Sequence, residues 1–188
     1  MEETQLTLTA EEQEKASRRS LYEWAEAIIF ALVLATAFCA LVCRMVTVDG
    51  DSMLNTLHDK DALLMVNAFY TEPQYGDIVV IQQGDDAPLI KRVIAKEGDT
   101  IEIDPATEQV ILNGEILEEP YLDFPTPTLY GFTGPYTVPE DSVFVMGDNR
   151  VNSHDSRDLD GIGAVHEDDI MGKAVFRLLP LGDIGKIQ

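Results

Sequence analysis

Basic residues are scarce in this chain of 188 residues, which has 13 Lys and Arg against 34 Asp and Glu. The acidic excess is not confined to one end, because residues 45–188 hold 27 acids and nine bases, a net charge of −18. Proteins that bind nucleic acid need clustered Lys and Arg to neutralise phosphates. We therefore expect no nucleic-acid partner, and we interpret the acidic excess mainly as a solvated surface.

Cysteine and histidine are equally sparse. The two cysteines, Cys39 and Cys43, both lie in one apolar stretch, which excludes a disulfide framework and a zinc site. The three histidines are isolated from one another in the sequence, as surface residues usually are. Residues 156–167 approximate a twelve-residue calcium loop but lack the acid at its first position and flanking helices. We expect neither a metal nor a cofactor.

Charge is absent from the 17 residues between Ala27 and Cys43. As a helix this stretch spans about 25 Å, and Glu26 and Arg44 at its ends can extend toward the headgroups of a hydrocarbon core about 30 Å thick. The pattern predicts one transmembrane helix over residues 21–44. A cleaved signal peptide is the alternative, but the apolar stretch continues six residues past the small residue Ala37, and Glu-rich sequence precedes it.

Basic residues are unevenly placed around this helix. Lys15, Arg18 and Arg19 precede it and only Arg44 follows. By the positive-inside rule, residues 1–20 form an acidic cytoplasmic tail, and residues 45–188 form a domain outside the cytoplasm.

Beyond Arg44 the sequence breaks into short apolar segments bounded by Gly, Asp or Pro, a pattern typical of strands. Asn113-Gly114 is a strong hairpin signal, and the five prolines between residues 120 and 139 indicate a long irregular loop. The predicted fold is mainly β, an antiparallel domain after one N-terminal transmembrane helix. The expected strands are residues 62–66, 78–81, 89–95, 101–103, 110–112, 142–146 and 174–178.

Lys91 stands out within the strand predicted at residues 89–95. Alternation places Lys91 on the face of Leu89 and Val93 and places Arg92 on the other face, so one cation must lie against apolar neighbours. A desolvated lysine loses its proton more readily and can serve as a general base near neutral pH. The alternative, which the pattern alone favours, is an edge-strand lysine that discourages aggregation.

Ser52 is the candidate nucleophile for such a base, although a serine in a polar loop is by itself a weak signal. A denser segment runs from residue 146 to residue 157. It holds two acids and two arginines close enough to build an ion-pair scaffold around a site, namely Asp148, Arg150, Asp155 and Arg157.

Four stretches occur together in one order: residues 50–57, 76–79, 91–99 and 147–161. With the apolar span they cover most of the chain, and the last stretch is the most specific. In these features the sequence resembles the type I signal peptidases, membrane-bound Ser/Lys enzymes of bacteria that remove signal peptides from exported proteins. Its length and single span resemble the compact members of that family.

The resemblance implies a role for each candidate residue. Ser52 would attack the scissile carbonyl after a small residue in an Ala-x-Ala pattern, and Lys91 would act as general base through an acyl-enzyme. Preproteins would be the substrates, membrane lipid would surround the span, and the enzyme would lie in the bacterial cytoplasmic membrane. Gly50 and Met53 would contact substrate, and Arg92 would be structural. Ser153 would bond the Lys91 amine, and the supporting ion pairs would come from Asp148, Arg150, Asp155 and Arg157.

Two positions depart from the family pattern. Gly50 stands where some relatives have a serine that supplies a second oxyanion donor, and Asn55 stands where proline is usual. Two other functions remain open at this point. A self-cleaving Ser/Lys peptidase related to SOS repressors is disfavoured by the span and by the absence of a DNA-binding helix pair. A non-catalytic, membrane-tethered β-domain that binds exported proteins would be favoured if Ser52 and Lys91 lay too far apart to bond.

Overall fold

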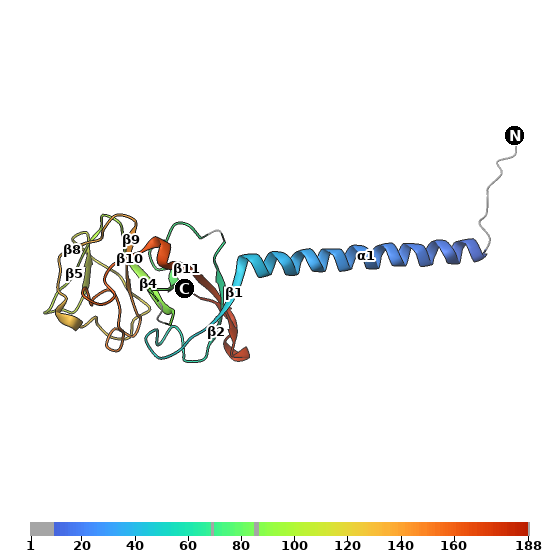
Figure 1. The fold of residues 1–188 in the computed structure, drawn as a ribbon. Helices are drawn as coiled ribbons and strands as arrows, with labels where there is room; N and C mark the ends of the chain where they lie inside the picture. Colours follow the sequence, from blue (N-terminus) through green and yellow to red (C-terminus); the bar gives the residue numbers. More distant parts are fainter. Residues whose placement is uncertain (1–9, 69, 85–86, 188) are drawn as a thin grey trace, which may run out of the picture. The chain divides into compact units, whose positions relative to one another are not determined.

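The computed structural model describes residues 10–68, 70–84 and 87–187 and divides between Leu41 and Val42 into two compact units (Figure 1). The first unit contains the helix α1, Ala10–Val42, apart from the last helical residue, Val42, which belongs to the second unit. Its segment Ser17–Phe38 is apolar enough to cross a membrane, and at 1.5 Å per residue its 22 residues span about 33 Å. Large apolar side chains along it, Trp24 and Phe30 among them, are exposed, which suits a helix surrounded by lipid.

The second unit is built from antiparallel strands in two sheets (Figure 1). The larger sheet has the order β1-β2-β11-β3-β4-β9-β10, with β12 paired to β11, and the smaller has the order β7-β6-β5-β8. The larger sheet contains β1 Cys43–Thr47, β2 Ala62–Val66, β3 Ile78–Ile81, β4 Leu89–Lys96, β9 Ser142–Met146, β10 Val165–His166, β11 Ile170–Leu179 and β12 Gly185–Lys186. The smaller contains β5 Thr100–Ile103, β6 Val110–Leu112, β7 Glu115–Ile116 and β8 Tyr136–Thr137. Three short 3-10 helices complete the unit, η1 Leu129–Gly131, η2 Glu167–Asp169 and η3 Leu181–Asp183.

Three clusters of buried apolar side chains form the core. β3 and β9 lie inside the larger sheet and are buried on both faces, which explains why they read as continuous apolar runs. The first cluster includes Met53 and Leu57 from the connection between β1 and β2. The core therefore anchors an irregular segment as well as the strands, and that segment carries Ser52.

The predicted fold class, a mainly antiparallel β-domain with one N-terminal apolar helix, is confirmed. The Asn113-Gly114 hairpin is confirmed as well, since it joins β6 to β7 with both residues at positive φ. The segment predicted as an irregular loop contains β8, which pairs with β5. Cys43 and Arg44, expected at the end of the span, already belong to β1.

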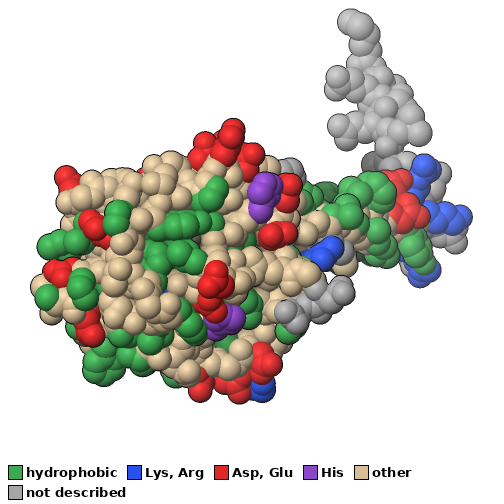
Figure 2. Space-filling view, turned by 60° about the vertical axis from the view of Figure 1, so that its left-hand side comes forward, with side chains coloured by type: hydrophobic (Ala, Val, Ile, Leu, Met, Phe, Trp, Pro, Cys, Tyr) green, Lys and Arg blue, Asp and Glu red, His purple; other side chains and the backbone are tan. Residues whose placement is uncertain are grey.

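Acidic side chains are scattered over the face of the β-domain that Figure 2 presents. Figure 2 shows acidic side chains in small groups over the face it presents, with few Lys or Arg among them. This distribution matches the expectation of a solvated acidic surface.

Candidate active site

Ser52 lies in an irregular loop that the core holds in place. We refer to residues 49–57 as the Ser52 loop. The Leu57 backbone N–H donates to the Met53 carbonyl at 2.8 Å, which closes one helical turn just after Ser52. Met53 and Leu57 are fully buried, whereas Ser52 remains partly exposed. The burial of Met53 and Leu57 in the core thus fixes this turn and leaves the Ser52 hydroxyl at its surface.

Gly50 enters this loop with φ at +89°, a backbone conformation that side-chain-bearing residues rarely adopt. Its N–H donates to Asp59 Oδ1 at 2.9 Å, which fixes the conformation. A Cβ placed on Gly50 would meet nothing within 4 Å, so space does not exclude a side chain there. The positive φ of Gly50 disfavours a side chain, so a serine at position 50 would require a different loop conformation.

Met53, expected at the substrate, is 1% exposed and lies in the core, while its neighbour Leu54 is partly exposed. The apolar character of the rim beside Ser52 therefore comes from Leu54. Met53 contributes packing beneath the serine.

Lys91 lies on β4, which is an inner strand between β3 and β9. Its side chain is buried, so the alternative of an edge-strand lysine that faces solvent and discourages aggregation is wrong. Lys91 is 2% exposed, and its Nζ donates to Ser52 Oγ at 2.9 Å and to the Ile90 carbonyl at 3.1 Å. Residues 39 positions apart in the sequence thus meet with the geometry that proton transfer requires.

Burial lowers the pKa of Lys91 to about 8, because a desolvated ammonium is disfavoured. The negative charges of Asp155 and Asp148 oppose this change, and the positive charge of Arg157 adds to it. A neutral amine at this position can accept the proton of Ser52, so the pair can generate a nucleophilic oxygen at mildly alkaline pH.

Asp155 and Arg157 form a fully buried ion pair close to Lys91. Arg157 donates from Nε and Nη2 to the two carboxylate oxygens, each at 2.8 Å, and the Gly147 N–H donates to Asp155 at 3.1 Å. Burial alone would raise the pKa of Asp155, but its hydrogen bonds with Arg157 and the Arg157 charge outweigh burial and lower it. Asp155 therefore stays ionised and holds the following segment in one geometry.

Asp148 and Arg92 form a second buried pair, which ties β4 to the Ser52 loop. Arg92 Nε and Nη2 donate to the Asp148 carboxylate at 2.8 and 2.7 Å, and Thr56 Oγ1 donates to the same carboxylate at 2.5 Å. The Arg92 guanidinium also lies over the Tyr121 ring, 3.9 Å from its centroid. Alternation predicts that one of the two adjacent cations is buried, and in fact both are.

Arg150 forms the third buried pair, with Glu119. Its Nη2 and Nη1 donate to the two Glu119 oxygens at 2.5 and 3.0 Å, and Nη1 also donates to Thr126. The four scaffold residues expected from sequence thus surround the site, with Glu119 supplying a partner from a loop about 30 residues earlier. The interpretation that these four residues support the site is based on their positions around it.

Ser153 is buried beside Gly147, but the described residues show no bond between it and Lys91. Its Oγ lies close to the Asp155 carboxylate and helps to lower the pKa of that group, although the contact does not have good hydrogen-bond geometry. A Cβ on Gly147 would lie 2.3 Å from Ser153 Oγ and 2.4 Å from the Ser52 carbonyl oxygen. Only glycine fits at 147, because the two serine segments close in on it from both sides.

Sequence reasoning missed three residues that position the Ser52 loop. Asn149 donates from its backbone N–H to the Ser52 carbonyl at 3.0 Å and from Nδ2 to the Asp51 carbonyl at 2.9 Å. Arg177 on β11 donates to the Thr56 carbonyl, and Thr56 also bonds Asp148. Asn149 lies within residues 146–157, the segment singled out for its acids and arginines, so its position next to Asp148 and Arg150 indicated that it belongs to the site. Nothing in the local sequence marks Arg177.

Comparisons with known proteins identify the family to which the chain belongs. The family model described as signal peptidase, peptidase S26, matches residues 21–179. Signal peptidase I S of Bacillus subtilis is 38% identical over 181 residues, covering 91% of this chain and 96% of that protein. A signal peptidase I of Bacillus amyloliquefaciens is 37% identical, covering 94% and 98%. A crystal structure of a signal peptidase I from Enterococcus faecalis V583 has 30% identity and a TM-score of 0.45, covering 54% of this chain and 96% of that one. The chain belongs to the signal peptidase family, peptidase S26, whose members are serine endopeptidases.

Proposed function

We propose that Ser52 and Lys91 form the catalytic dyad with which this chain removes signal peptides from exported preproteins. The observation that carries the proposal is the 2.9 Å bond between Lys91 Nζ and Ser52 Oγ, made by an amine whose pKa burial lowers to about 8. The neutral amine accepts the serine proton as Oγ attacks the scissile carbonyl carbon. Lys91 then returns that proton to the leaving amine, and the acyl-enzyme remains on Ser52.

Deacylation uses the same two residues in reverse. Lys91 takes a proton from water, the resulting hydroxide attacks the acyl carbon, and the proton returns to Ser52 as the C–O bond breaks. The Ser52 backbone N–H is the oxyanion donor we assign, and the positive φ of Gly50 argues against a side-chain donor from position 50. Ser153 has a buried hydroxyl beside Gly147 and Asp155, and we assign to it the bond to the Lys91 amine once Lys91 has accepted the Ser52 proton.

An open strand edge beside the dyad supports an extended substrate. β4 pairs with β3 along residues Leu89–Arg92, whereas its described pairing with β9 begins only at Arg92. On the β9 side no described strand pairs with residues 89–91, and a peptide in extended conformation can approach this edge next to Ser52, where the Ile90 carbonyl already accepts a bond from Lys91 Nζ. Gly50 and Leu54 lie at the surface of the Ser52 loop, and we assign the small residues of an Ala-x-Ala pattern to the strand edge beside this loop.

The apolar helix supports membrane anchoring with the N-terminus in the cytoplasm and the β-domain outside. Residues Ser17–Phe38 have the length and apolar character of a span, and bases lie mainly before it. An anchored domain would meet preproteins where their signal peptides emerge from the bilayer.

The direct test is cleavage of a preprotein by the purified full-length chain in detergent. Wild type should release the mature protein after a small residue, and Ser52→Ala and Lys91→Ala should each lose activity by orders of magnitude, because the dyad acts as a unit. Thr137→Ala, which removes an exposed hydroxyl from β8 of the smaller sheet, is the control and should retain activity. Cleavage at wild-type rate by either alanine variant would refute the dyad, and equal cleavage of a substrate with Trp at the small positions would refute the specificity.

A further inference from the structure

A cavity of about 170 Å³ lies beside the Ser52 loop, on the side formed by the segment that follows β9. Three parts of the chain build it, residues 54–55, 123–124 and 148–151. Its wall residue Asn149 is bonded to the carbonyls of both Ser52 and Asp51. The cavity therefore lies next to the Ser52 loop, and Asn149 connects its wall to the backbone of the proposed nucleophile.

We infer that this cavity binds the first residues of the mature protein, downstream of the scissile bond, and that Asp123 makes it disfavour acidic residues there. The inference rests on the proposed function, in which the residues upstream of the bond pair with the open edge of β4 at residues 89–91. A peptide bonded to Ser52 must leave that edge and continue across the Ser52 loop. At about 3.3 Å per residue, two or three residues of extended peptide reach about 7 to 10 Å beyond the scissile bond.

The charges of the cavity lining are balanced except at one residue. Asp148 is neutralised by Arg92, and Arg150 is neutralised by Glu119, in both cases through paired hydrogen bonds. Asp123 is exposed, and among the described residues no hydrogen bond or ion pair is made by its carboxylate. The lining thus has one uncompensated negative charge.

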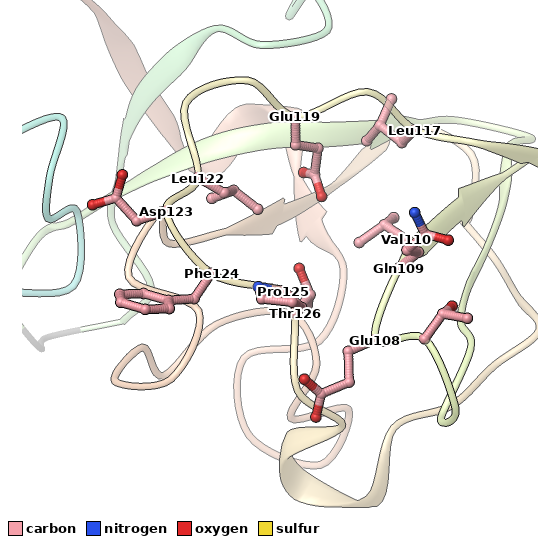
Figure 3. Close-up of a pocket in the computed structure, with 11 residues that line it drawn as sticks. Glu108, Gln109, Val110, Leu117, Glu119, Leu122, Asp123, Phe124, Pro125 and Thr126 are labelled. Carbon is pink, nitrogen blue, oxygen red and sulfur yellow. The ribbon is translucent and has the colours of Figure 1, made fainter.

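The orientation of Asp123 fits this role. A neighbouring cavity of about 320 Å³ is also lined in part by Asp123 and Phe124. In Figure 3 the side chains of Leu122 and Glu119 point toward its middle, whereas those of Asp123 and Phe124 point to the opposite side of their loop. Both residues that turn away also line the cavity beside Ser52. Apolar contact there comes from Leu54, Phe124 and Val151, of which the last two are largely exposed. A lysine or arginine has the matching chemistry, an apolar stem and a cationic end.

The expected selectivity is modest because the carboxylate is solvated. Exposed ion pairs contribute up to about 1 kcal/mol, which corresponds to about a fivefold difference in kcat/KM between Lys and Glu at one substrate position. The difference should shrink as salt is raised, because screening acts on exposed charges.

The experiment uses the full-length chain in detergent and one preprotein with Lys, Gln or Glu at each of the first three downstream positions. Wild type should prefer Lys over Glu about fivefold at one of these positions, Asp123→Asn should remove the preference, and Asp123→Lys should invert it. The control is Asp183→Asn, which removes an exposed acid of η3 that does not line the cavity and should keep the wild-type preference.

Two outcomes would overturn the inference. One is a Lys-to-Glu ratio unchanged in Asp123→Lys at all three positions. The other is an Asp123-dependent preference that appears only when the same series is placed upstream of the scissile bond, which would assign the cavity to the signal peptide. Failure of wild type to cleave every preprotein would instead contradict the proposed function, so the two failures are distinguishable.

Discussion

Replacing Lys91 by Met removes the titrating amine from the core and keeps an unbranched side chain of similar length. Burial lowers the pKa of Lys91 from 10.5 to about 8 in the folded chain. Between these two values the unfolded chain binds more protons than the folded one, so the free energy of unfolding of wild type should rise with pH. Below pH 8 the ammonium is buried at a cost to stability, and above 10.5 that cost is gone.

The size of the effect follows from the difference between the two pKa values. Each pH unit corresponds to about 1.4 kcal/mol, so the full difference amounts to about 3 kcal/mol of unfolding free energy, of which about 2.5 kcal/mol falls between pH 7 and pH 10. Lys91→Met lacks this contribution. It also loses the amine bonds to Ser52 and to the Ile90 carbonyl, which lowers stability by about 1 kcal/mol for each bond and does so at every pH.

The informative quantity is therefore the change with pH and not the stability at one pH. Urea unfolding of the full-length chain in detergent micelles, followed by circular dichroism, gives the unfolding free energy of both proteins at several pH values. The stability of Lys91→Met relative to wild type should fall by about 2.5 kcal/mol from pH 7 to pH 10. Ser52→Ala retains the lysine and serves as the control, since its stability should follow that of wild type with pH.

Parallel curves for Lys91→Met and wild type over this range would refute the reasoning. They would mean that the pKa of Lys91 lies near its ordinary value in the folded chain. The lysine would then remain almost entirely protonated even at pH 8 to 9, and another group would have to accept the Ser52 proton.

Three further predictions concern activity and topology. The kcat/KM for a preprotein should rise with pH around a midpoint near 8 and should be insensitive to EDTA; a midpoint at 10 or above, in a pH–rate profile, would contradict a desolvated base. Arg177→Gln should lower kcat about five- to tenfold, because it removes the bond that holds the Thr56 carbonyl of the Ser52 loop. Adding Asn55→Pro should restore part of that loss, because proline restricts the backbone of the loop, and a double-mutant cycle would measure the recovery. Protease added to intact spheroplasts should digest the chain after Arg44 and spare a tag at Met1, and the opposite pattern would reverse the proposed orientation.

Most strands of the β-domain could be predicted because their residues alternate or form short apolar runs between turn residues. The strand at 78–81 and the hairpin at Asn113-Gly114 are examples, and both depend on local sequence alone. β8 could not be predicted in this way. It is two residues long, lies among prolines, and exists because Tyr136 and Thr137 find partners on β5, more than 30 residues earlier.

The candidate dyad could be located in the sequence only through the combination of several motifs. Alternation left open which of two adjacent cations is buried, and an edge-strand lysine was the simpler interpretation. The structure buries both, because Arg92 meets Asp148 from a segment 56 residues later and Lys91 meets Ser52 from a loop 39 residues earlier. Pairings over such separations depend on the packing of the whole sheet, which no local pattern records.

The pKa of Lys91 shows why the overall charge of the domain is a poor guide to its site. A net charge of −18 on residues 45–188 would by itself stabilise the ammonium form and raise the pKa. The groups that act on Lys91 are few and close, however, and they are largely paired: Asp155 is bonded to Arg157, and Asp148 to Arg92. Each arginine offsets the carboxylate beside it, while the remaining surface acids are exposed and screened by salt. Desolvation is then the largest influence left, so an acidic protein can maintain a lysine that loses its proton near pH 8.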